Sequence, residues 1–292
     1  MEKLKPPFVF QTDSEIVQSV YDSHPNYIVV EEAEKNNYCA IYFSSNNIYY
    51  PNDKTTFDRA IAQKNRFEWY GTRVPYCSKH IFVRDIHKQW FLTGISRAAD
   101  SPEKLLALLS RETAGYKIVT LGSSAGGFAA VLYGSLLKAD TILSFNGQFE
   151  VNSLLKSSSE AVDPILFRYT ATGFRKHYFD VKPFITDPSS VFYLYSGRSA
   201  VDVEQKAHVD DLKLRVIQFN TSHHGIPFLK SNLPEVLKMR KPQLIELTRK
   251  AHHPIQFSIR LIGLPRTIQS VYAQVKAKLI QGKYRIAGWA GE

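Results

Sequence analysis

A serine set between two glycines stands where a nucleophile could act. Residues 116–121 form a short apolar run, Gly122, Ser124 and Gly126 follow at every second position, and an apolar segment over 128–138 comes next. Strand, Gly-x-Ser-x-Gly and helix in this order are typical of a nucleophile elbow, whose strained turn lifts the serine Oγ above the sheet. Glycine suits both flanking positions because a Cβ there would collide with the neighbouring strand and helix. The pattern predicts Ser124 as a nucleophile.

An acid and a histidine follow two later strand-like runs. Asp202 comes soon after the apolar run 191–195, and two histidines at 223–224 follow the run 212–219. Serine, acid and histidine in this chain order, each beyond its own strand, form the arrangement that a Ser-acid-His triad takes on a parallel sheet. The three features together predict acyl transfer through an acyl-serine.

The choice of acid and base within these loops is open. We favour Asp202 because a short loop separates it from its strand, with Glu204 as the alternative. We favour His224 because Gly225 lets its loop turn tightly towards the serine, with His223 as the alternative.

Backbone donors for a developing oxyanion are expected at two places. In this architecture one N–H comes from the loop after an early strand and the other from the residue after the nucleophile. Ser44, Ser45 and Asn46 follow the β-rich run 38–43, and Ala125 follows the serine. An ordinary strand-ending turn accounts for the Ser-Ser-Asn loop equally well.

Asp85 and His87 also follow a strand-like run, at 80–84, but they precede the serine. That order does not suit the triad, so we assign them to loop structure or to the lining of a pocket. Trp90 in the same loop either walls an acceptor site or belongs to the core.

The elements that must position these groups alternate along the chain. Strand-like runs without hairpin signals between them predict a mostly parallel sheet with helices on both faces. We expect a catalytic domain over residues 1–230, a lid-like insertion at about 149–189, and a basic, mainly helical extension over 231–292. The strand-like runs are at 27–30, 38–43, 80–84, 116–121, 140–146, 191–195 and 212–219.

Composition narrows the class of protein. Two cysteines, Cys39 and Cys77, make neither a disulfide framework nor a metal cluster, and no apolar run or leader suggests a membrane span or secretion. We therefore expect a cytoplasmic protein without a metal. The net charge is +10, and from Lys230 onwards twelve basic residues face three acidic ones. Such a basic C-terminal segment either binds an anionic membrane or polymer, or is a solvated tail with no dedicated partner. The sequence has no zinc-finger or RNP-like pattern that would indicate binding to nucleic acid.

Four motifs together resemble a known family. Residues IYFSSNN (41–47), RDIHKQWFLTG (84–94), LGSSAGGFAA (121–130) and SHHG (222–225) resemble the α/β-hydrolase-type O-acetyltransferases that modify bacterial capsular polysaccharides. The resemblance covers about residues 27–230 and does not extend to the basic end.

The resemblance implies the α/β-hydrolase fold, acetyl-CoA as the donor substrate with no bound cofactor, and a polysaccharide hydroxyl as the acceptor. By position it implies Ser124 as the nucleophile, Asp202 as the acid and His224 as the base, with Ser45 and Ala125 at the oxyanion positions. Capsule assembly at the inner membrane would give the basic C-terminal segment an anionic surface to contact.

Two other classes of function compete with this one. A carbohydrate esterase would use the same triad with water as the acceptor, and the sequence does not separate the two. A non-catalytic module that binds a polymer through its basic surface is the second competitor, and the intact set of triad residues speaks against it.

Overall fold

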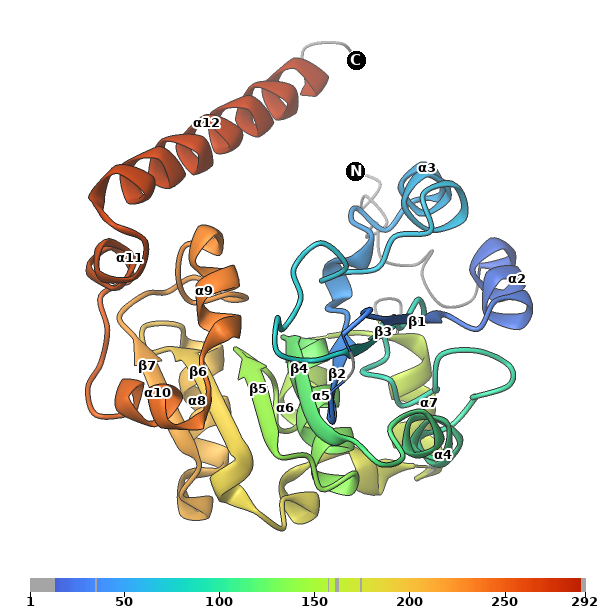
Figure 1. Ribbon diagram of the computed structural model, residues 1–292. Helices are drawn as coiled ribbons and strands as arrows, with labels where there is room; N and C mark the ends of the chain where they lie inside the picture. Colours follow the sequence, from blue (N-terminus) through green and yellow to red (C-terminus); the bar gives the residue numbers. More distant parts are fainter. Residues whose placement is uncertain (1–13, 35, 157, 161–162, 174, 290–292) are drawn as a thin grey trace.

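A seven-stranded sheet forms the centre of the computed structural model, which describes residues 14–34, 36–156, 158–160, 163–173 and 175–289 (Figure 1). The strand order is β1-β3-β2-β4-β5-β6-β7, with β1 antiparallel to β3 and every other pair parallel. The predicted α/β-hydrolase fold is confirmed. The strands are β1 Tyr27–Glu31, β2 Tyr38–Phe43, β3 Lys79–Val83, β4 Lys117–Ser123, β5 Thr141–Phe145, β6 Val191–Ser196 and β7 Arg215–Phe219.

The helices begin where the sequence offers caps and prolines. Ser101 Oγ accepts a hydrogen bond from Lys104 N at 3.1 Å, and Pro102 is the first residue of α4, whose fixed φ suits that position. The helices are α2 Glu15–Ser23, α3 Lys54–Phe57, α4 Pro102–Glu112, α5 Ala125–Leu136, α6 Asn152–Lys156, α7 Pro164–Thr172, α8 Ala200–His208, α9 Leu233–Lys238, α10 Lys241–Leu247, α11 Pro254–Ile262 and α12 Leu264–Trp289; a π-helix, Asp58–Gln63, continues α3.

Both faces of the sheet are covered by apolar side chains. Successive residues of β2 point to opposite faces, so that Ile41 and Phe43 join one core cluster while Ala40 and Tyr42 join another. The first cluster includes α4 and α5, and the second includes residues of α9, α10 and α11. Strands buried on both sides explain why the sequence of β4 and β5 reads as nearly continuous apolar runs.

The C-terminal part consists of two short helices followed by two longer ones. Val236, Leu244 and Phe257 are buried in the same cluster as β5 to β7. Pro254 opens α11 and Gly263, with φ 82°, closes it, so α11 and α12 are separate helices. Helix α12 projects away from the sheet (Figure 1). Within the described part of the chain, no helix combines the length and apolar character that crossing a membrane requires.

The segment at 149–189 contains α6, α7 and short 3₁₀ turns. Arg175 fastens it to the loop after β3 by donating from Nη1 to the carbonyls of Leu92 at 3.0 Å and Asp100 at 3.1 Å. Its function as a lid stays a prediction.

Candidate active site

The turn between β4 and α5 holds Ser124 in a strained backbone conformation. Its φ of 55° and ψ of −123° lie in a region that residues other than glycine rarely adopt, at a cost of about 1–3 kcal/mol. A Cβ on Gly122 would lie 2.1 Å from the carbonyl oxygen of Gly126, and one on Gly126 would lie 2.4 Å from that of Phe43. Both glycines are therefore required by close backbone contacts, as the sequence pattern predicts.

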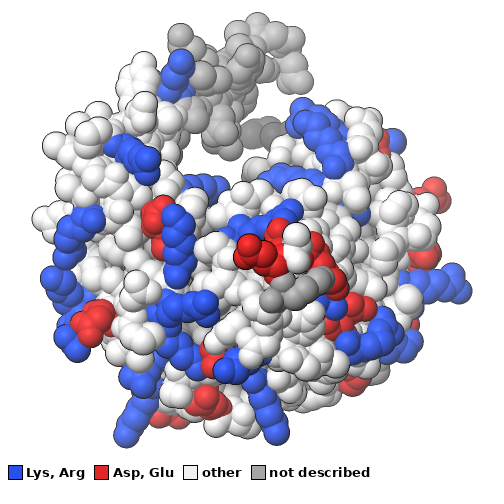
Figure 2. Space-filling model, viewed as in Figure 1, with Lys and Arg blue, Asp and Glu red and all other residues white. Residues whose placement is uncertain are grey.

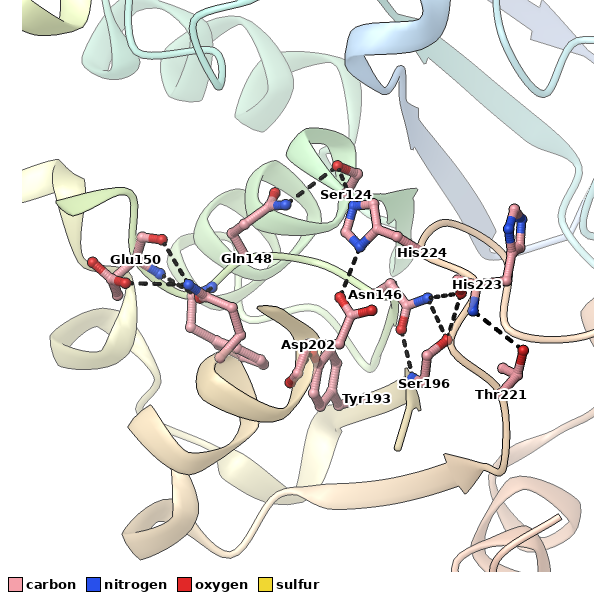
Figure 3. A network of polar contacts seen from close by, with 12 residues as sticks. Ser124, Asn146, Gln148, Glu150, Tyr193, Ser196, Asp202, Thr221, His223 and His224 are labelled. Atoms are coloured by element: carbon pink, nitrogen blue, oxygen red, sulfur yellow. Dashed lines mark hydrogen bonds and ion pairs between the residues drawn. The ribbon is translucent and has the colours of Figure 1, made fainter. Parts of the chain in front are cut away.

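Three side chains from separate elements meet at this turn (Figure 3). His224 Nε2 lies 2.9 Å from Ser124 Oγ, and His224 Nδ1 lies 2.8 Å from Asp202 Oδ1. Asp202 sits in the first turn of α8 and is 1% exposed, whereas the His224 side chain is 40% exposed. The buried carboxylate fixes the tautomer and direction of a histidine that solvent can still reach.

The alternative residues lie elsewhere. Glu204 is exposed on α8. The side chain of His223 is exposed and points away from Ser124 (Figure 3). The structure thus brings Ser124, Asp202 and His224 together and leaves the other two candidates outside the cluster.

The main chain beside His224 is tied to the neighbouring strand ends. The carbonyl of His223 accepts hydrogen bonds from Ser196 Oγ at 2.6 Å and from Asn146 Nδ2 at 3.2 Å. Asn146 Oδ1 in turn accepts from Ser196 N at 2.7 Å. These bonds fix the base relative to β5 and β6, next to the strand that carries the nucleophile.

The two expected oxyanion donors are placed differently. Ala125 is the first residue of α5, directly after the nucleophile. Ser45 N donates to Glu68 Oε2 at 2.5 Å, and Ser45 Oγ donates to Glu68 Oε1 at 3.0 Å. Burial raises the pKa of Glu68 above its usual range. A carboxylate therefore occupies the Ser45 N–H in this structure, which the sequence pattern does not anticipate.

Gln148 is a neighbour of the nucleophile that sequence reasoning missed. Its Nε2 donates to Ser124 Oγ at 3.3 Å, and its Oε1 accepts from Trp90 Nε1 at 3.2 Å. A signal was available, because Gln148 follows β5 closely and β5 pairs with β4. Residues beyond the carboxyl ends of adjacent parallel strands gather at one edge of the sheet.

A pocket of about 360 Å³ opens above these groups. Ser124 and His224 form part of its wall, together with polar and aromatic side chains from three other segments. These are Asn46, Asn47, Tyr50, Asn52, Trp90 and Asp163. Trp90 is thus both buried and part of the pocket wall.

The wall containing Trp90 is built on Asp85. Its carboxylate accepts four backbone N–H bonds of 2.8–3.0 Å, from the residues at 87, 88, 89 and 91. Lys88, Trp90 and Phe91 all have positive φ. Burial raises the pKa of Asp85 to about 6. Asp85 therefore organises the loop, as expected, and His87 lines a separate pocket.

Lys88 adds a buried cation to the same wall. It is 1% exposed, its Nζ donates to the Tyr49 carbonyl and to Asn52 Oδ1, and it lies 3.7 Å from the centre of the Tyr49 ring. Burial lowers the pKa of Lys88 to about 7. In the described ranges no group of three or more His, Cys, Asp and Glu side chains is placed to hold a metal ion.

Comparisons with known proteins find similarity at the level of structure. No protein-family model matches the chain, and no curated protein matches its sequence. A capsule O-acetyltransferase of Neisseria meningitidis serogroup A is 12% identical, with 75% of this chain and 90% of that chain covered and a TM-score of 0.49.

Two further solved structures are of proteins from Staphylococcus aureus. The S-formylglutathione hydrolase FrmB is 9% identical, with 75% and 92% covered and a TM-score of 0.44. MenH is 10% identical, with 78% and 100% covered and a TM-score of 0.38. With identities this low, the function of the chain has to be argued from its own residues.

Proposed function

We propose that the protein is a serine-dependent O-acetyltransferase that moves an acetyl group from acetyl-CoA to a sugar hydroxyl of a bacterial capsular or surface polysaccharide. The observation that carries the proposal is the hydrogen-bonded series Ser124, His224, Asp202 in the wall of a polar pocket. The donor follows from the sequence resemblance.

In the first half-reaction, Ser124 Oγ attacks the thioester carbon and passes its proton to His224 Nε2. The carbonyl π-electrons move to oxygen, and the resulting oxyanion faces the N–H at the start of α5. When the intermediate collapses, the carbon–sulfur bond breaks and the leaving thiolate takes the proton from His224. The acetyl group stays on Ser124 as an ester.

In the second half-reaction, the acceptor hydroxyl attacks the acetyl ester while His224 removes its proton. The bond between the acetyl carbon and Ser124 Oγ then breaks, and His224 returns the proton to Oγ. Asp202 holds the imidazole with Nδ1–H towards its carboxylate and stabilises the cation in both steps.

The pocket wall supports a sugar as the acceptor. Side-chain amides of Asn46, Asn47 and Asn52 and the carboxyl group of Asp163 line it, beside the rings of Tyr50 and Trp90. Amides and carboxyl groups bond hydroxyl groups, and aromatic rings offer apolar faces to a sugar ring.

An esterase is the second candidate. The His224 side chain is 40% exposed, so water can approach the same acyl-serine. The two functions differ only in which hydroxyl resolves the intermediate.

Release of free CoA from acetyl-CoA separates these possibilities. The assay is run on wild type and Ser124→Ala, with and without a panel of capsular oligosaccharides. We expect release that depends on a sugar and is lost in Ser124→Ala. Release without sugar that still requires Ser124 would identify the esterase, and sugar-dependent release that survives Ser124→Ala would refute the triad.

The two adjacent histidines provide a matched pair of variants. His224→Gln should abolish CoA release because it removes the base, whereas His223→Gln should retain it because the His223 side chain points away from Ser124. The reverse result would assign the base to His223.

Helix α12 suits contact with an anionic membrane, and we include this contact in the proposal. Leu264, Ile268, Tyr272 and Val275 are 51–68% exposed and recur every three or four residues, so they share one face of the helix. Residues 247–291 contain eight Lys and Arg and no Asp or Glu. Figure 2 shows Lys and Arg side chains along the edges of the hollow near the top of the view. Such a surface would hold a cytoplasmic enzyme at the membrane where an anionic polymer is assembled.

Sedimentation with vesicles tests the contact. The full-length protein should sediment with vesicles of phosphatidylglycerol and phosphatidylcholine, and less with phosphatidylcholine alone. Ile268→Ser combined with Tyr272→Ser should reduce the bound fraction. Equal binding to both kinds of vesicle, or none, would contradict the contact.

A further inference from the structure

We propose that the Gln148 side-chain amide is an oxyanion-hole donor of this site, taking the part expected of the Ser45 N–H. This inference rests on the proposed acyl transfer. Three features of the structure support it: the contact of Gln148 with the nucleophile, the fixed direction of its amide, and the occupied state of Ser45.

The first feature is the contact with the reacting atom. Gln148 Nε2 lies 3.3 Å from Ser124 Oγ, and His224 Nε2 lies 2.9 Å from the same oxygen. In the tetrahedral intermediate the oxyanion and Ser124 Oγ are attached to the same carbon, so the oxyanion lies two bonds away from Oγ. A side-chain NH₂ group carries two N–H donors, so one that reaches Oγ is also in reach of the oxyanion.

The second feature is the orientation of the amide. Trp90 Nε1 is a donor only, so the atom of Gln148 that it bonds must be the oxygen Oε1. The NH₂ end is thereby turned towards Ser124. Gln148 is 4% exposed and Trp90 is 7% exposed, so the pair is shielded from competing water.

The backbone on both sides of Gln148 is also fixed. Asn146 N donates to Leu194 O at 2.8 Å, and Phe149 N donates to Gln205 Oε1 at 2.6 Å. A Cβ on Gly147 would lie 2.8 Å from the backbone of Gly127, so the loop is pressed against α5. A donor held in this way needs little rearrangement when charge develops, which is the property that makes such donors effective.

The third feature concerns Ser45. Its N–H and its hydroxyl both donate to the Glu68 carboxyl group, at 2.5 Å and 3.0 Å, so the N–H already has an acceptor. An oxyanion that approached this N–H would have to displace Glu68. With Ala125 at the start of α5, Gln148 completes a pair of donors that leaves the Ser45–Glu68 contact intact.

Hydrolysis of p-nitrophenyl acetate by wild type, Gln148→Ala and Gln148→Glu tests the assignment, with Ser124→Ala as the blank. Loss of one oxyanion donor should lower kcat about 10²–10³-fold in Gln148→Ala, with KM changed little. Gln148→Glu keeps the size and the bond from Trp90 but places a carboxyl group at the oxyanion. It should therefore be no more active than Gln148→Ala.

A packing role for Gln148 gives the opposite order. In that case the isosteric Gln148→Glu would retain more activity than Gln148→Ala, and KM would rise with the loss of kcat; either result overturns the proposal. So does a Gln148→Ala variant within about threefold of wild type. Hydrolysis by Ser124→Ala at the rate of wild type would instead overturn the proposed function.

If circular dichroism shows that the Gln148 variants do not fold, Trp90→Phe provides a second test of the proposal. Phenylalanine retains the ring but cannot hold Oε1, so kcat should fall several-fold with KM unchanged. A folded Trp90→Phe variant with the kcat of wild type would refute the proposal that the bond from Trp90 directs the Gln148 NH₂ group towards the oxyanion.

Discussion

Lys88→Met should change how the stability of the protein depends on pH. The ammonium is buried against the Tyr49 carbonyl and Asn52 Oδ1, and the described side chains give it no carboxylate within ion-pair distance. Asp85 and Glu68 lie near enough to favour its charge, but burial outweighs them and lowers its pKa from 10.5 to about 7. Methionine fills similar space without a charge.

The sign follows from proton counting. Between pH 7 and 10.5 the unfolded chain keeps a proton on Lys88 that the folded chain has lost. The free energy of unfolding therefore rises with pH in this window, by about 1.4 kcal/mol per unit where the difference is one full proton. Allowing for partial titration near pH 7, wild type should gain about 2 kcal/mol relative to Lys88→Met between pH 7 and pH 9.

Urea unfolding of both proteins at pH 7, 8 and 9, followed by circular dichroism, measures this gain. Starting at pH 7 avoids the titration of Asp85, whose pKa is about 6. The hydrogen bonds from Lys88 Nζ to Tyr49 and Asn52 add a constant difference in the free energy of unfolding and do not alter its slope with pH. A difference between wild type and Lys88→Met that stays flat from pH 7 to pH 9 would refute the reasoning, because Lys88 would then be charged throughout.

Three further substitutions probe the site. Asp202→Asn should lower kcat about 10³–10⁴-fold at unchanged thermal stability, since an amide cannot hold the same His224 tautomer; a loss below tenfold would contradict this. Gly126→Ala should lower the free energy of unfolding by about 3 kcal/mol, because its Cβ would lie 2.4 Å from a carbonyl oxygen, while Gly71→Ala, in open space, should not; similar urea midpoints for both would refute the clash. Asp85→Asn should lower kcat and the melting temperature together, because one oxygen replaces a carboxylate with four N–H partners; a change in neither would count against its role in the loop.

The sequence pattern was sufficient for the parts of the site that depend on local geometry. Gly122 and Gly126 predict the elbow because only glycine fits two close backbone contacts there. All seven strand-like runs correspond to strands. For the central strands the reason is that parallel strands buried on both faces need nearly continuous apolar residues. The choice of His224 over His223 followed from Gly225, and the structure places His224 on Ser124.

The rest depends on contacts between distant segments. Glu68 reaches Ser45 from 23 positions away, and Trp90 reaches Gln148 from 58. No spacing rule marks such pairs, because the path of each loop is set by packing. The antiparallel pairing of β1 with β3 is of the same kind, since the two strands are separated by β2 in the chain.

Under the proposed function, Asp85 has a consequence for how a preference for one acceptor sugar could be changed. One carboxylate arranges the whole loop that carries Lys88 and Trp90, so a substitution in that loop alters a unit whose members depend on one another. In the wall with Asn46, Asn47 and the half-exposed Tyr50, Ser45 Oγ accepts one backbone N–H bond, from Asn47 at 3.1 Å, whereas Asp85 accepts four in its loop. Natural divergence and laboratory selection for a new sugar should therefore accumulate changes at residues 46–50 and keep the 85–91 loop as an inherited block.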